Sequence, residues 1–181
     1  MGLTKALATF DVAIKESGDT KTLTFSKMLT SAKDLQELDI TNEYVSACAV
    51  IFALAECEKD INAGKEMLEY INGPEDVSGF DINFIKEQIK QYPYLMRSYF
   101  NGTSVDNNYE VKNVSINVKV NAYSKDEAGY IKLWFKSTGA DSERALTLRQ
   151  KASTKEWFLS SDSYKGLMAG IRTPKAADKW A

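Results

Sequence analysis

The feature that most constrains this chain is a change in the spacing of its hydrophobic residues near residue 112. Before that point, apolar residues recur every three or four positions, which is the spacing of one helix face. From residue 114 to residue 120, valine or isoleucine alternates with a polar residue, which is typical of a strand with one face in water. The sequence therefore predicts an α+β fold with a helical N-terminal half packed on a C-terminal four-stranded antiparallel meander sheet.

The first half predicts four or five helices. The first carries Leu3, Leu7, Phe10 and Ile14 and is ended by Gly18, and a short second one, opened by Ser26 behind Phe25, carries Met28, Leu29, Ala32 and Leu35. The third contains the apolar run 44–55, is capped by Thr41 or Asn42, and ends near Lys59. Asp60 and Asp81 cap two more helices, which stop at Gly73-Pro74 and before Pro93.

The second half predicts four strands near residues 114–120, 130–136, 146–149 and 157–159. Their links contain Gly129, Gly139 and Ser153-Thr154 and have the length of hairpin loops. No internal repeat or linker divides the chain. We expect one domain over 1–181, with a helical layer at about 1–92, an ordered loop at 93–111, the sheet at 112–160 and a tail at 161–181.

The amino-acid inventory excludes several kinds of chemistry. The chain has no histidine, which rules out Ser-His-Asp and Cys-His nucleophiles and histidine-ligated zinc. Cys48 and Cys57 are nine residues apart in one predicted helix and fall on opposite faces, so we expect two separate core thiols. The glycines form no phosphate-binding loop of the usual kinds. The sequence thus predicts no catalytic residue, no metal site and no cofactor.

Composition and hydropathy indicate an ordinary globular protein. Hydrophobic residues make up 44% of the chain, and its 10 glycines and 3 prolines are too few for a collagen-like or low-complexity chain. The longest apolar run, from Tyr44 to Ala55, is shorter than the roughly 20 residues that span a bilayer. The N-terminus lacks the apolar stretch of a secretory signal. We expect a cytoplasmic protein without a membrane partner.

Charge is divided along the chain in the same way as hydrophobic spacing. Residues 1–111 carry a net charge of −8 and residues 112–181 carry +6. One interpretation is a basic sheet face for an anion or a nucleic-acid backbone, with Tyr130 and Trp134 stacking between Lys132 and Lys136. The other is complementarity within the fold of a monomer or between the subunits of a weak homodimer. The pI of 5.4 makes nucleic acid an unlikely main partner.

Arginine is scarce, with 4 residues against 19 lysines, and every arginine lies at or after position 97. Guanidinium groups form planar bidentate contacts with carboxylates or phosphates, so these residues are candidates for an anion pocket. The alternative is that they tie loops down, for example Arg144 to Asp141 across a turn, or Arg172 to a helix C-terminal carbonyl. Both interpretations concern Arg97, Arg144, Arg149 and Arg172.

The segment from Arg97 to Tyr109 joins helix to sheet and concentrates turn-forming and aromatic residues. Asn and Asp side chains satisfy nearby backbone groups while the aromatic residues anchor the loop, so an ordered structural loop is one interpretation and a binding loop is the other. The candidate ligand-binding residues of the chain are Arg97, Tyr99, Asn107, Asn108, Tyr109, Asp141, Arg144 and Arg149.

Several short motifs carry a family resemblance over roughly residues 45–181. They are Ser98-Tyr99-Phe100-Asn101-Gly102-Thr103, Asn107-Asn108-Tyr109, Gly139-Ala140-Asp141-Ser142-x-Arg144, Leu148-Arg149, Trp157-Phe158-Leu159, Ile171-Arg172-x-Pro174 and Trp180-Ala181. In combination they resemble a family of bacterial proteins described only as a domain of unknown function. Asp106 and Lys179 stand where that pattern has prolines. The resemblance implies an intact single domain and no particular activity.

Three hypotheses about function follow. The first is a non-catalytic binding or protein-interaction module, whose contact surface contains Lys132, Trp134, Lys136 or Trp180 and in which no pocket gathers two or more ionisable groups. The second is a small-molecule or anion-binding cavity protein of cone-like α+β fold, similar in shape to nuclear-transport-factor-like or cystatin-like folds, with or without catalysis. There Asp141, Tyr99 and Tyr109 would do acid–base work beside Arg97 or Arg149. The third is self-assembly driven by the charge division.

Overall fold

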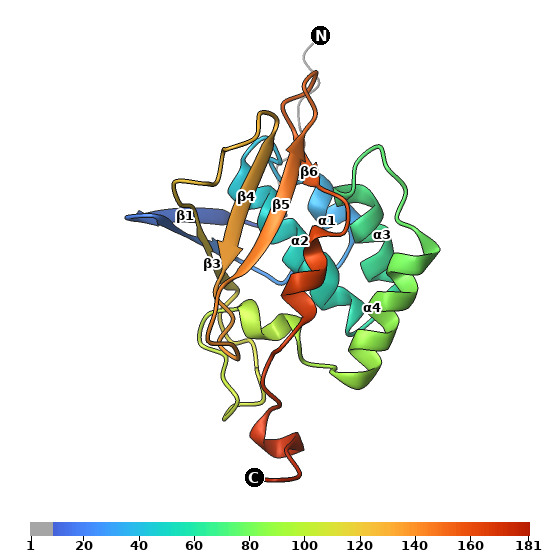
Figure 1. Cartoon of the computed structure of the whole chain (residues 1–181), viewed down its shortest axis with the longest axis vertical. Coiled ribbons are helices and arrows are strands. Elements are labelled where there is room, and N and C mark those ends of the chain that lie inside the picture. Colours follow the sequence, from blue (N-terminus) through green and yellow to red (C-terminus); the bar gives the residue numbers. More distant parts are fainter. Residues whose placement is uncertain (1–8) are drawn as a thin grey trace.

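The computed structural model of the chain describes residues 9–181. It contains one antiparallel sheet of six strands, which follow one another in chain order from β1 to β6 (Figure 1). The α+β class and the meander are confirmed, and the predicted number of four strands is wrong. The strands are β1 (Val12–Ser17), β2 (Thr20–Phe25), β3 (Ser115–Lys119), β4 (Tyr130–Phe135), β5 (Arg144–Gln150) and β6 (Trp157–Leu159).

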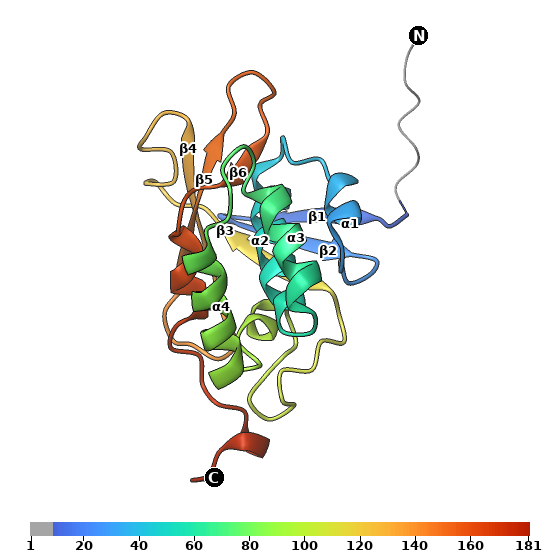
Figure 2. The same cartoon turned by 90° about the vertical axis from the view of Figure 1, so that its right-hand side faces the viewer.

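The helices between β2 and β3 cover one face of this sheet. Helix α2 lies next to the sheet, and α3 and α4 lie outside α2 (Figure 2). Two short 3-10 segments follow the sheet along the chain. The helical elements are α1 (Ala32–Gln36), α2 (Glu43–Cys57), α3 (Ile61–Ile71), α4 (Gly79–Gln91), η1 (Met96–Tyr99), η2 (Ser163–Met168) and η3 (Lys175–Ala177).

The two additional strands replace the predicted first helix. Leu3 and Leu7 lie outside the described residues, and the prediction is wrong from Val12 onward, where β1 begins. Gly18 has a φ of +60° in the two-residue turn between paired Ser17 and Thr20, a conformation that favours glycine. On β2 the inward residues Leu23 and Phe25 alternate with threonines, and Leu23 pairs with Ile116 of β3. The predicted helical layer of 1–92 therefore contains a hairpin that extends the sheet.

Helix capping agrees with the predictions at two helices and differs at two. Asn42 and Asp60 cap α2 and α3 through their side chains, as expected. The predicted helix opened by Ser26 is wrong, because the Ser26 hydroxyl accepts a hydrogen bond from the Asp11 N–H and α1 begins only after Ser31. Ser78, and not Asp81, caps α4 and is paired with Asp81 in a capping box.

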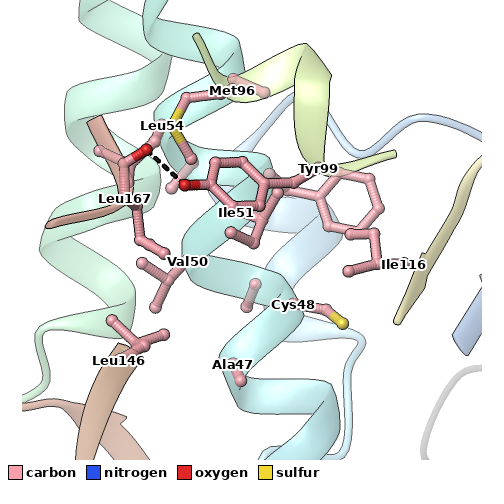
Figure 3. Packing of buried hydrophobic residues seen from close by; sticks show 14 of the residues in the cluster. Ala47, Cys48, Val50, Ile51, Leu54, Met96, Tyr99, Ile116, Leu146 and Leu167 are labelled. Atoms are coloured by element: carbon pink, nitrogen blue, oxygen red, sulfur yellow. Dashed lines mark hydrogen bonds between the residues drawn. The ribbon is translucent and has the colours of Figure 1, made fainter. Parts of the chain in front are cut away.

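Helix α2 forms the centre of the core because it is apolar on all sides. Its residues from Val45 to Cys57 are all buried, between the sheet on one side and α3, α4 and η1 on the other. Figure 3 shows Val50, Ile51 and Leu54 of this helix packed among residues of other elements. Both cysteines are buried free thiols, as predicted, and burial raises the pKa of Cys57 to about 12.

The apolar character of α2 serves this internal packing. Among residues 9–181, none of the helices combines the length and the hydropathy that crossing a bilayer requires.

Candidate functional site

The segment from Arg97 to Tyr109 turns its aromatic residues into the core. Tyr99 is buried, and its hydroxyl donates a 2.6 Å hydrogen bond to the Leu167 carbonyl (Figure 3). Tyr109 is also buried, stacks on Tyr94 with ring centroids 5.7 Å apart, and donates to the Arg172 carbonyl at 2.7 Å. Both tyrosines hold the C-terminal segment against the body of the protein, and burial raises the pKa of each.

The asparagines of this segment organise its backbone. The side-chain oxygen of Asn107 accepts a hydrogen bond from the Ser104 N–H at 2.8 Å. The side-chain NH₂ group of Asn107 donates a hydrogen bond to the Gly102 carbonyl at 3.1 Å. Asn108 and Tyr109 have φ values of 56° and 50°, in the left-handed region. The ordered-loop interpretation agrees with these contacts, and a ligand-binding role for these residues stays a prediction.

Each of the four arginines has its own partners within the protein. Arg97 donates to the Asn108 carbonyl at 3.1 Å, and its Nε lies 3.6 Å from a Glu58 oxygen. Arg144 donates to the carbonyls of Ser142 and Ala169, Arg172 pairs with Asp141, and Arg149 lies 3.6 Å from Glu75. The guanidinium groups therefore serve separate loop contacts rather than one shared pocket.

The sheet presents its second face outward, away from the helices. Strand register places Tyr130, Lys132 and Trp134 of β4 on this face beside Arg149, Thr147 and Ala145 of β5. Tyr123, whose exposed fraction is 70%, lies in the β3–β4 connection next to them. A depression of about 430 Å³ is lined by Tyr123, Tyr130, Lys132, Trp134 and Thr147, together with Ser124, Asp126 and Glu127 of the β3–β4 connection. We call the first five of these residues the outer-face patch.

The outward positions of the first five strands also share one sign of charge. Lys15, Lys119, Lys132 and Arg149 occupy this face, and the register places no acidic side chain among its outward strand positions. The other two residues predicted for the interaction surface, Lys136 and Trp180, are not among these strand positions. Lys136 donates to the carbonyls of Ala140 and Asp141, and Trp180 is 96% exposed on the tail that projects beyond η3 (Figure 1).

Sequence reasoning missed two glutamates at the C-terminal end of α2. Glu56 and Glu58 line a cavity of about 270 Å³ together with Arg97, which differs from the expectation that no pocket gathers several ionisable groups. Burial raises the pKa of Glu58 to about 8, although the Met96 N–H and Arg97 lower it. The available signal was spacing, because Glu56 follows the buried Phe52 by four residues and so lies on the same helix face.

The fold and its uncovered sheet face define an α+β protein with a six-stranded meander on one side and helices on the other. The chain belongs to the family described as Domain of unknown function (DUF6935), which matches residues 24–175. The predicted resemblance to a family of unknown function is thereby confirmed. No curated protein and no solved structure matches the chain.

Proposed function

We propose that this protein is a non-catalytic binding module that holds an acidic segment of a protein partner on its outer-face patch. The observation that carries the proposal is the uncovered sheet face, where aromatic and basic side chains lie side by side on β4 and β5. Tyrosine, tryptophan and basic residues are enriched at protein interfaces, because they combine large contact area with polar or charged groups.

The internal pairing of ionisable groups supports a binding role over a catalytic one. Glu58 is engaged by the Met96 N–H at 2.6 Å and by Arg97, while Asp81 is engaged by Ser78 and Tyr164. These carboxyl groups of Glu58 and Asp81 therefore connect one element of the fold to another. On the outer face, by contrast, Trp134 and Tyr130 are only partly buried, and Lys132 is exposed.

The charge of this face argues for an acidic partner. Of the basic residues at its outward strand positions, Lys119 and Arg149 pair with carboxylates of the protein, while Lys15 and Lys132 form no ion pair among residues 9–181. Residues 112–181, which include β3 to β6, carry a net charge of +6. Opposite charge on the partner accelerates association and selects orientation, while the aromatic side chains supply affinity.

The test is a selection of peptides from a random display library on the full chain. We expect the enriched peptides to be rich in aspartate and glutamate. Their affinity should fall at least tenfold in the Trp134→Ala/Lys132→Glu variant, because loss of a hot-spot tryptophan costs about 2 kcal/mol or more and about 1.4 kcal/mol is already tenfold in affinity.

The matched control is Lys86→Glu, which reverses an exposed lysine on α4, on the helical side of the molecule. It makes the same change of net charge as Lys132→Glu and should leave peptide affinity unchanged. Peptides without acidic residues, or equal binding to the outer-face and control variants, would contradict the proposal.

A further inference from the structure

A second feature, separate from the sheet face, is the cavity at the C-terminal end of α2. It lies where this helix meets the segment after β2 and the connection between α4 and η1. The apolar part of its wall comes from Met28, Leu29, Phe52, Ala55 and Pro93. The charged part comes from Glu56, Glu58, Lys59 and Arg97. The cavity thus combines an apolar floor with a charged rim.

Three of the four charged residues are already engaged or point to solvent. Glu58 accepts the Met96 N–H at 2.6 Å and lies 3.6 Å from Arg97 Nε. Arg97 also donates to the Asn108 and Pro93 carbonyls. Lys59 is exposed. Glu58 and Arg97 therefore have partners within the protein, whereas Lys59 places a positive charge at the rim of the cavity without an ion pair among residues 9–181.

Glu56 is different. Its exposed fraction is only 8%, yet among residues 9–181 its carboxylate makes no hydrogen bond and no ion pair within 4 Å. Among those residues, every side-chain oxygen that is fully shielded from solvent has a hydrogen-bond partner. Because the Glu56 oxygens have no partner, they must be in contact with solvent. The cavity that Glu56 lines is where this contact occurs. The stem of Glu56 is thus buried while its carboxylate faces the solvent of the cavity. An unpaired carboxylate beside an apolar wall attracts a cation more strongly than one in open water, because the low dielectric constant of the wall screens the charge less.

We infer that this cavity binds a small organic monocation, with its ammonium group on Glu56 and its apolar body against Met28, Ala55 and Pro93. An anion in the same position would be repelled by the unpaired Glu56 carboxylate. A divalent metal ion takes six to eight oxygen ligands, or an octahedral set, which a single free carboxylate does not supply. The volume of about 270 Å³ is below the roughly 300–1,000 Å³ of sites for drug-sized ligands, so the ligand is an alkyl- or arylammonium ion of modest size.

Burial also affects Glu56 itself. It raises the pKa of this carboxyl group, and Asp60 acts in the same direction, while Lys59 lowers it. A bound ammonium ion would act in the same sense as Lys59 and favour the ionised carboxylate. Lys59 is therefore the group in the chain that competes with an external cation for Glu56.

The test is calorimetric titration of the full chain with 2-phenylethylammonium and n-butylammonium chloride. The neutral 2-phenylethanol and the anionic 3-phenylpropionate serve as matched probes of the same apolar body. We expect the two ammonium ions to bind and the neutral and anionic probes to bind at least tenfold more weakly. Glu56→Gln should lower ammonium affinity at least tenfold, while Glu66→Gln, an exposed carboxylate on α3, should leave it unchanged.

Thermal unfolding of Glu56→Gln provides the check on folding. We expect its midpoint to be at or above that of the unaltered chain, because partial burial raises the pKa of Glu56 and so disfavours its ionised form, which glutamine lacks. Lys59→Gln should bind the ammonium ions as tightly or more tightly. If ammonium ions bound only to the Lys59→Gln variant and not to the unaltered chain, the Lys59 ammonium group would itself be the cation paired with Glu56. That result would overturn the inference. Absence of binding to any variant, or equal binding to Glu56→Gln and Glu66→Gln, would overturn it as well.

Discussion

At the scale of single residues, Glu58 makes stability depend on pH. Its pKa of about 8 in the folded state lies above the ordinary value of 4.5, so the folded protein binds a proton more tightly than the unfolded chain. Its contribution to the free energy of unfolding is therefore largest below about pH 4.5 and is lost as pH rises toward 8. Within this window we expect a slope of about −1.4 kcal/mol per pH unit at most.

Urea unfolding at pH 5, 6, 7 and 8 measures this slope. Glu58→Gln keeps an oxygen that accepts the Met96 N–H but does not titrate, so it should flatten the pH dependence and be more stable than the unaltered chain at pH 8. Glu56, whose pKa is also raised, should account for a smaller slope that remains. An unchanged slope in Glu58→Gln would assign the pH dependence to other groups.

At the scale of elements, the sequence predicted those whose hydrophobic spacing was unambiguous. Helix α2 has a long apolar run and strands β3 to β5 have alternating ones, and their predicted positions are confirmed. The first hairpin was missed because Phe10 and Ile14 happen to repeat the helix spacing, while Leu23 and Phe25 show the strand period over only one step. Its signal was the Gly18-Asp19 pair, which suits a two-residue hairpin turn.

The candidate sites were predictable to a smaller extent. Alternation along β4 placed Lys132 and Trp134 on the uncovered face, since local spacing determines which way a strand residue points. The partners of Arg144 and Arg172, and the cavity beside Glu56, depend on segments far apart in the chain. Local patterns do not contain that information.

The contact between α2 and α3 yields a prediction at the same scale. A Cβ on Gly64 of α3 would lie 2.4 Å from the Cys57 sulfur and 2.5 Å from its backbone nitrogen, far inside contact distance. Gly64→Ala should therefore lower the free energy of unfolding by about 1–3 kcal/mol through overpacking, despite the better helix propensity of alanine. Urea unfolding measures the loss.

Gly79→Ala is the matched control for this substitution. Gly79 is the first residue of α4, and a Cβ there meets nothing within 4 Å. We expect this change to be neutral or to stabilise by less than about 1 kcal/mol. If both alanine variants had the same stability, close helix contact at Gly64 would not be the reason for glycine there.

At the scale of the whole molecule, α2 connects the helical layer with both ends of the sheet. It contacts strands near each end and the surrounding helices, and the Ser46 hydroxyl donates to the Trp157 carbonyl of β6 at 2.5 Å. We propose on this basis that the chain unfolds as a single domain. The sheet and the outer helices both bury their apolar faces against α2. If α2 unfolds, both of these faces become exposed to water, so neither part is stable without it.

Thiol labelling compared with urea unfolding tests this cooperativity. Cys48 and Cys57 lie at different depths along α2, with exposed fractions of 0% and 4%, and each reacts only when its surroundings open. In Cys48→Ala and Cys57→Ala variants, the remaining thiol should give the opening free energy that urea unfolding of the same variant gives, within about 10–15%. Labelling of Cys57 at a clearly lower free energy than global unfolding would mean that α3 separates from α2 first, and that the helical layer and the sheet are not one cooperative unit.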